Sequence, residues 1–171
     1  MWNVIAKKNI VFLFCLILVS AQGAAMSIFI KSKDAEATLF SPLSGKIFHN
    51  GKPAANANIR LWIKWKDKEG ETFNYLTDEN GYFDIPLKKV DYKDNPLAQI
   101  VITQEIKVDY NNETYLIWSL GRTRTEEYSE LGGRPVNLTC ELNDELEPHR
   151  QNGILLATSC KWDSIEKVQG E

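Results

Sequence analysis

Apolar and polar side chains alternate with a period of two along much of this chain, and this feature constrains the fold most. In residues 57–66 one row of side chains is apolar: Ala57, Ile59, Leu61, Ile63 and Trp65. The other row is polar except for one tryptophan: Asn58, Arg60, Trp62, Lys64 and Lys66. Successive side chains of a strand point to opposite faces, whereas a helix repeats every 3.6 residues. The pattern predicts a strand with one buried face, and no amphipathic helix is predicted.

Similar segments separated by turn residues predict about eight strands. Asn50-Gly51 follows the expected strand 43–49 and is the strongest two-residue hairpin signal, because both residues tolerate positive φ. Further strands are expected at 71–77, 82–86, 99–109 and 113–120, with two more near the C-terminus; 91–96 and 121–133 are expected to be loops. Short strands without helices bury two apolar faces most readily as an antiparallel β-sandwich, and a closed barrel is the alternative.

The N-terminus has the pattern of a secretory signal peptide. Lys7 and Lys8 precede an apolar run over residues 10–19, and small residues follow it. The run is too short for a membrane-spanning helix, which needs roughly 20 residues. We therefore predict a signal peptide over residues 1–21, with cleavage after Ala21 and with Gly23 and Ala25 as alternative positions. The protein is expected to be periplasmic or secreted, with no stable membrane span after cleavage.

The expected mature chain has three parts and two cysteines. A polar lead-in over 22–37 precedes a β-domain over 38–163 and a flexible tail over 164–171. Cys140 and Cys160 both lie on apolar rows, and they oppose each other if the last two strands pair antiparallel. Since an exported chain meets an oxidising environment, one disulfide is predicted. It would contribute about 3 kcal/mol by restricting the unfolded chain.

Charge and motif content narrow the range of functions. The chain has 20 Lys and Arg against 23 Asp and Glu, so no basic field exists to attract nucleic acid. Neither of its two histidines, His49 and His149, belongs to a known catalytic or zinc-binding pattern, and no phosphate-binding glycine loop is present. We therefore expect a protein that is not an enzyme and needs no cofactor.

Three oxygen-bearing residues around one turn are weak calcium candidates. Asp78, Asn80 and Asp84 lie in and just after the sequence Asp78-Glu79-Asn80-Gly81. This spacing lacks the full loop and the bidentate Glu of an EF-hand. A turn needs Asp, Asn and Gly for backbone reasons alone, and we favour that interpretation over a metal site.

Two sets of segments resemble known families. Ser44-Gly45-Lys46-Ile47, Asn50-Gly51-Lys52-Pro53-Ala54, residues 57–62 and residues 77–85 resemble transthyretin-like, carboxypeptidase-regulatory-like domains. This resemblance implies a sandwich of seven or eight strands. Residues 116–119, 132–135, 140–142 and 160–162 resemble an uncharacterised family of small exported proteins from Gram-negative bacteria. That resemblance implies a stand-alone periplasmic or secreted domain without an assigned activity.

Several residues are candidates for a binding surface. Trp62 lies between Arg60 and Lys64 on the polar row, Tyr115 is expected on the off-core face of its strand, and Arg122 and Arg124 lie in the long loop 121–133. A second layer, formed by the lead-in or by this loop, could cover Trp62 instead, and we favour covering because buried aromatic residues outnumber functional ones.

The expected function is binding to a protein partner. An immunity protein that neutralises a periplasm-targeted toxic effector is one concrete version. A carbohydrate-binding module that uses Trp62 and Tyr115, and a small hydrolase, are the alternatives.

Overall fold

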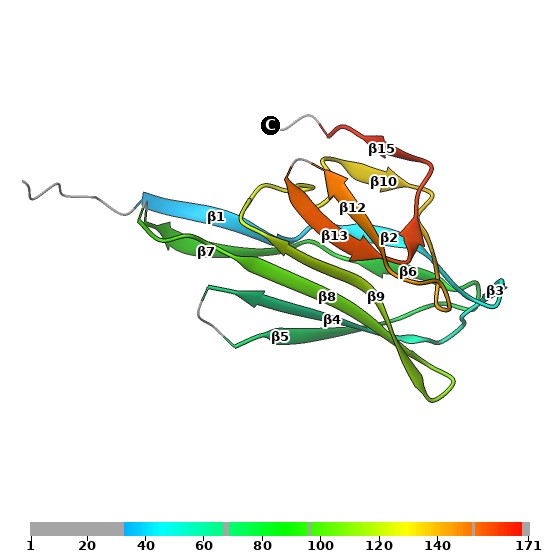
Figure 1. Cartoon of the computed structure of the whole chain (residues 1–171). Coiled ribbons are helices and arrows are strands. Elements are labelled where there is room, and N and C mark those ends of the chain that lie inside the picture. The colour runs from blue at the N-terminus through cyan, green and yellow to red at the C-terminus, as the bar shows by residue number, and fades with distance from the viewer. Residues whose placement is uncertain (1–32, 67–68, 96, 152, 169–171) are drawn as a thin grey trace, which may run out of the picture. The chain divides into compact units, whose positions relative to one another are not determined.

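The computed structural model describes residues 33–66, 69–95, 97–151 and 153–168, and every regular element among them is a strand (Figure 1). The first eight strands are β1 (Lys33–Phe40), β2 (Leu43–His49), β3 (Lys52–Pro53), β4 (Asn58–Trp65), β5 (Glu71–Leu76), β6 (Tyr82–Ile85), β7 (Lys88–Asp94) and β8 (Ile102–Tyr110). The others are β9 (Glu113–Arg122), β10 (Arg134–Val136), β11 (Thr139–Glu141), β12 (Glu147–Gln151), β13 (Ile154–Thr158), β14 (Cys160–Lys161) and β15 (Ser164–Glu166). The all-β prediction is confirmed, although the strands are more numerous and shorter than expected. The described residues contain no apolar helix of membrane-spanning length.

The largest sheet has six antiparallel strands in the order β12-β13-β9-β8-β4-β5. The long strands β4, β8 and β9 run side by side through it (Figure 1). On β4 the apolar row predicted from the sequence is buried, and the polar row lies on the opposite face. Side chains of residues that pair directly in an antiparallel ladder lie on the same face of the sheet. The buried row of β4 therefore also identifies which residues of β5 and β8 face the core.

A second sheet has five strands, with the order β14-β11-β2-β3 and with β6 paired to β2. Its β2–β11 pair is parallel, which corrects the expectation of a wholly antiparallel fold. A hairpin forces neighbouring strands to be antiparallel, but β2 and β11 are far apart in the chain and lack that constraint. Buried side chains from both sheets form one hydrophobic core, which includes Ile47, Phe83, Leu61, Ile106 and Trp118.

The predicted Asn50-Gly51 turn is confirmed. Both residues have positive φ, 55° and 71°, and they join β2 to β3. The carboxylate of Glu141 on β11 accepts the backbone N–H groups of both turn residues at 2.9 Å. These hydrogen bonds lower the pKa of Glu141, although burial, the largest single influence on that carboxylate, acts in the opposite direction. Glu141, which is about ninety positions further along the chain, therefore stabilises the turn.

Three segments that were expected to lack strands contain them. Residues 33–37 of the predicted lead-in belong to β1, and most of the predicted loop 91–96 belongs to β7; these strands pair with each other from Lys33↔Asp94 onward. Both strands are partly exposed along most of their length, so their sequences lack the apolar alternation of a buried face. In the expected tail, β15 pairs with β10. The predicted signal peptide, residues 22–32 and residues 169–171 lie outside the described residues.

A bulge in β9 changes which of its side chains face the core. The register with β8 shifts between Ile106↔Trp118 and Lys107↔Leu116, which leaves Ile117 as the extra residue. Tyr115 therefore pairs with Val108 on the core side, whereas Leu116 faces outward. This corrects the prediction that Tyr115 lies on the off-core face of its strand. One extra residue reverses the alternation of a strand.

The predicted disulfide is confirmed. Cys140 on β11 is directly opposite Cys160 on β14, and the two residues form a buried disulfide. The last of the expected strands divides between two sheets. β13 belongs to the six-stranded sheet, and the chain crosses at Ser159 into β14 of the five-stranded sheet.

Candidate binding surface

One face of the six-stranded sheet points away from the core and is not covered by the described residues, and we call it the outer face. It carries, from β4, β5 and β8, the side chains Asn58, Arg60, Trp62, Lys64, Thr72, Asn74, Leu76, Thr103, Glu105, Lys107 and Asp109. Each of these residues is exposed or half-buried, and none is buried. A layer packed against the face would bury at least part of this set, so the described chain leaves the face accessible to a partner.

An ion pair orders one end of the outer face. Nε and Nη2 of Arg60 donate to the two carboxylate oxygens of Asp109, both at 2.7 Å. Thr114 and Asn58 also donate to this carboxylate. These hydrogen bonds, chiefly the one from Arg60, lower the pKa of Asp109 to about 2. The planar bidentate contact fixes the guanidinium beside the sheet.

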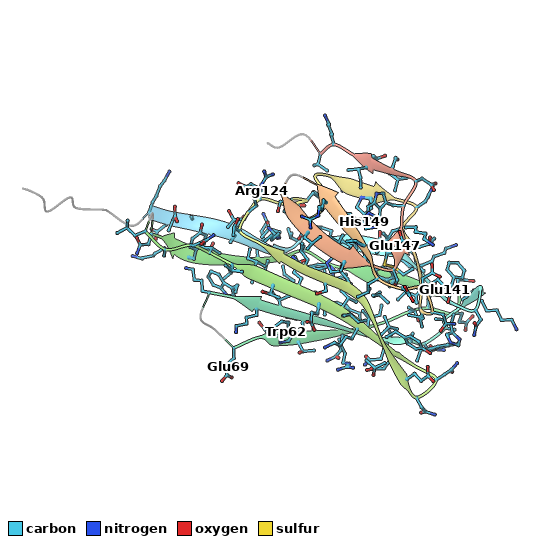
Figure 2. The ribbon with its side chains drawn as sticks, in the orientation of Figure 1. Trp62, Glu69, Arg124, Glu141, Glu147 and His149 are labelled. Atoms are coloured by element: carbon cyan, nitrogen blue, oxygen red, sulfur yellow. A yellow bond between two sulfur atoms is a disulfide. The ribbon has the colours of Figure 1, made fainter. Side chains whose placement is uncertain are left out.

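Trp62 lies in the middle of the outer face, between Glu105 on β8 and Thr72 on β5. The backbone of Gly70, just before β5, packs so closely against the indole that a β-carbon there would lie 2.0 Å from Nε1. Figure 2 shows Trp62 and Glu69, the residue before Gly70, on the same side of the molecule. Trp62 is half-buried, so one part of the ring is supported and another part reaches solvent.

The described parts of the segments that we expected to cover Trp62, residues 33–37 and the loop 121–133, lie elsewhere. β1 pairs with β7 at the end of the lead-in, and the backbone of Thr38 donates to Thr125 in the long loop. β1, which begins in the lead-in, therefore contacts the loop, while Gly70 from the β4–β5 connection contacts the indole.

The charges on the outer face are only partly paired. Lys107 lies 2.9 Å from Glu105, and Arg60 is held by Asp109. Within the described part of the chain, Lys64 forms no ion pair, and its side chain is exposed. An exposed ammonium next to a half-buried indole suits a ligand that combines a carboxylate with an apolar group.

Three of the predicted surface residues do not belong to this face. Tyr115 lies on the core side of β9, where its hydroxyl donates to Glu113 at 2.5 Å and lies 3.3 Å from Nε2 of His49. Arg124 is exposed but well separated from Trp62 in Figure 2. Arg122 is buried, which corrects its assignment to a binding surface.

Arg122 is buried among acceptors from its own loop and from the distant strand β1. Its guanidinium donates to the carboxylate of Glu130 at 3.0 Å, to the carbonyl of Thr38 at 2.7 Å and to the hydroxyl of Ser129 at 2.7 Å, as well as to the carbonyl of Arg124. Burial, the largest influence, lowers the pKa of Arg122, and Glu130 opposes that change. The guanidinium thereby fastens the long loop to β1.

The carboxylate of Glu130 also accepts hydrogen bonds from two further buried residues, which sequence analysis missed. Gln104 donates from Nε2 to Glu130 at 2.9 Å and to the carbonyl of Leu39 at 2.7 Å, and the hydroxyl of Ser41 donates to Glu130 at 2.7 Å. Gln104 stands on the core row of β8 between Ile102 and Ile106. A polar residue at a core position is a signal that could have revealed this network.

The histidines lie on strands, and the calcium candidates lie on β6 or in the turn before it. His49 ends β2, whereas His149 on the edge strand β12 packs on Trp162 with ring centroids 4.9 Å apart. Oδ1 of Asp78 accepts the backbone N–H groups of Asn80 and Tyr82, both at 2.8 Å. This carboxylate stabilises the turn, as the backbone interpretation of the sequence predicts.

Comparison with known protein families gives a match over much of the chain. The model of a family described as "Domain of unknown function (DUF6795)" matches residues 43–145, which is more than half of the chain. No curated protein and no solved structure matches.

Proposed function

The chain belongs to the DUF6795 family of domains of unknown function, and from that premise we propose that it is an exported, non-catalytic domain that binds a protein partner through its outer face. The observation that carries this proposal is the placement of Trp62. The ring is half-buried and supported by Gly70, with Arg60 and Lys64 on either side of it along the strand. Tryptophan and arginine are the residue types most enriched at binding hot spots.

The charges around Trp62 indicate the chemistry of the partner. Arg60 is already engaged by Asp109, so the exposed Lys64 is the cation that a partner can pair with. We propose that the partner places an apolar side chain against Trp62 and a carboxylate near Lys64. Because an exposed ion pair adds little affinity, Trp62 would supply most of the binding energy and Lys64 mainly the orientation.

Two observations support the proposed location outside the cytoplasm. The N-terminal Lys7-Lys8 and the apolar run over residues 10–19 have the pattern of a secretory signal. The Cys140–Cys160 disulfide is a bond that persists in oxidising compartments and is rare in the cytosol. We further propose that the two sheets form a transthyretin-like sandwich; their shared core supports this arrangement.

The test is affinity capture followed by measurement with the purified partner. Wild type, Trp62→Ala and Lys64→Glu would be used to capture proteins from an extract of the producing cell's envelope. The control is Lys93→Glu on β7, an exposed charge reversal away from the outer face. For a partner identified by mass spectrometry, calorimetry should show that Trp62→Ala weakens binding about tenfold or more and that Lys93→Glu leaves it unchanged.

Other outcomes would favour other functions. A partner that binds wild type and Trp62→Ala equally contradicts the proposal. Retention on polysaccharide that Trp62→Ala abolishes indicates a carbohydrate-binding module, and turnover in an esterase and peptidase screen indicates a hydrolase. Protection of cells against a periplasm-targeted toxic effector would identify the chain as an immunity protein.

A further inference from the structure

The strand β5 at one edge of the six-stranded sheet has an unpaired side. β4 is its only ladder partner among the described residues, and Figure 1 shows it as the outermost strand of its sheet. The opposite edge strand, β12, contains Pro148, which lacks an N–H group and blocks further pairing. β5 contains neither proline nor lysine, so it lacks the usual protection of an exposed edge.

The register with β4 identifies the backbone groups on that free side. Thr77 N–H donates to the Ala57 carbonyl at 3.1 Å, which makes this pair a hydrogen-bonded one. Hydrogen-bonded and non-hydrogen-bonded pairs alternate along an antiparallel ladder. The pairs of Thr72, Asn74 and Leu76 with β4 are therefore non-hydrogen-bonded, and the N–H and C=O groups of these three residues point away from the sheet.

These three residues form a self-complementary set. If two copies of β5 pair antiparallel about a two-fold axis at Asn74, then Asn74 faces its own copy and Thr72 faces Leu76. Every residue of these pairs has its backbone groups on the free side, so all of those groups become hydrogen-bonded. Any displacement of this register leaves some of them unpaired.

The side chains of β5 are also compatible with the register centred on Asn74. On the core side Phe73 would face Tyr75 of the other copy, an aromatic pair of the kind that stabilises adjacent strands. On the outer side Leu76, which is 66% exposed, would lie against Thr72. Glu71 would face Thr77, so no like charges oppose each other along the strand.

We propose that the protein forms a two-fold symmetric dimer by antiparallel pairing of β5 with β5 of a second copy, centred on Asn74. The two six-stranded sheets then become one continuous sheet, and both copies of Trp62 lie on the same face of it. An isologous contact of this kind closes on itself and does not propagate into fibres. The dimer contact uses the edge of the sheet, whereas the proposed partner site uses its outer face.

The test uses a pair of charge variants whose effects depend on the two-fold register. Asn74→Lys and Asn74→Asp each place like charges opposite each other at the axis, so each should weaken dimerisation about tenfold or more by sedimentation. Mixing the two variants should restore a dimer that contains one copy of each. Asn74→Ala keeps all backbone groups and should dimerise like wild type. Circular dichroism spectra like that of wild type would show that the variants fold.

A second measurement observes the backbone directly. Hydrogen exchange at the amides of Thr72, Asn74 and Leu76 should slow as the wild-type concentration rises, and should stay fast in Asn74→Lys. Wild type that remains monomeric at all concentrations, or a dimer that both charge variants leave intact, would overturn the proposal. Protection of these amides only when another protein is added would also overturn it and would indicate a foreign strand. Trp62→Ala should still dimerise, so this proposal and the partner-binding proposal can fail separately.

Discussion

Nη2 of Arg122 lies 3.0 Å from Oε1 of Glu130, and the side chains of these residues are only 0% and 6% exposed. This buried ion pair connects the end of β9 to the long loop that follows it. Arg122→Met would leave the Glu130 carboxylate buried without its main counter-charge. Removing one member of a buried pair costs about 3–5 kcal/mol, and we expect a loss in that range in the free energy of urea unfolding.

Two variants test whether this loss comes from the buried charge. Arg124→Met removes an exposed arginine from the same loop and should change stability by less than about 0.5 kcal/mol. The double variant Arg122→Met/Glu130→Met removes both charges and should lose less than the sum of the two single changes. Strictly additive losses would contradict direct coupling between the two residues.

The Arg60–Asp109 pair predicts a measurable pH dependence. The pKa of Asp109 is lowered from 3.8 to about 2, so its contribution is fully present above pH 3.8 and is lost as the pH falls through about 2. In Arg60→Met the pKa should move back toward 3.8, as followed by carboxyl NMR signals. Because both side chains are about one-third exposed, the effect on stability should be small, about 0.2–1 kcal/mol, and should decrease with salt. An unchanged pKa in the variant would contradict this assignment.

Reduction of the Cys140–Cys160 disulfide should destabilise the fold. The disulfide joins residues 20 positions apart, and the entropy model predicts a contribution of about 3 kcal/mol. Cys140→Ala/Cys160→Ala should lower the free energy of unfolding by a similar amount. Because both cysteines are buried, alkylation followed by mass spectrometry should detect free thiols only after denaturation in reductant. Rapid labelling of the native protein would contradict this prediction.

Gly70→Ala should displace the Trp62 indole. An added β-carbon would lie 2.0 Å from Nε1, so the ring must move outward, and the NMR signal of its indole N–H should shift. Gly121→Ala is a matched control from the same sheet, because nothing lies within 4 Å of a β-carbon there. We expect Gly70→Ala to alter partner binding more than stability; equal indole spectra for both variants would contradict the packing at Trp62.

The strands with one buried face were predictable from the sequence, whereas the partly exposed pair β1 and β7 was not. Alternation over residues 57–66 is a local property of the sequence, and β4 follows it. β1 and β7 pair across an exposed ribbon with little apolar alternation, so their local sequences resemble loops. A strand of this kind is defined by its partner, which lies about fifty residues away.

The candidate surface was predictable only in part. Arg60, Trp62 and Lys64 lie together on the outer face because they share one row of one strand. Tyr115 lies on the other face because of the bulge at Ile117, which single-strand periodicity cannot reveal.

The sequence by itself determined the secondary-structure class, the core row of β4 and the pairing of Cys140 with Cys160, because each follows from the period of two in an extended chain. The tertiary structure alone decided that Arg122 is buried. Its acceptors are Glu130 in the loop that follows it and Thr38 on the distant strand β1, and a charged side chain is buried only where folding brings such partners together. It also decided that β5 is left at an open edge, since the order of strands in a sheet depends on which strands pair.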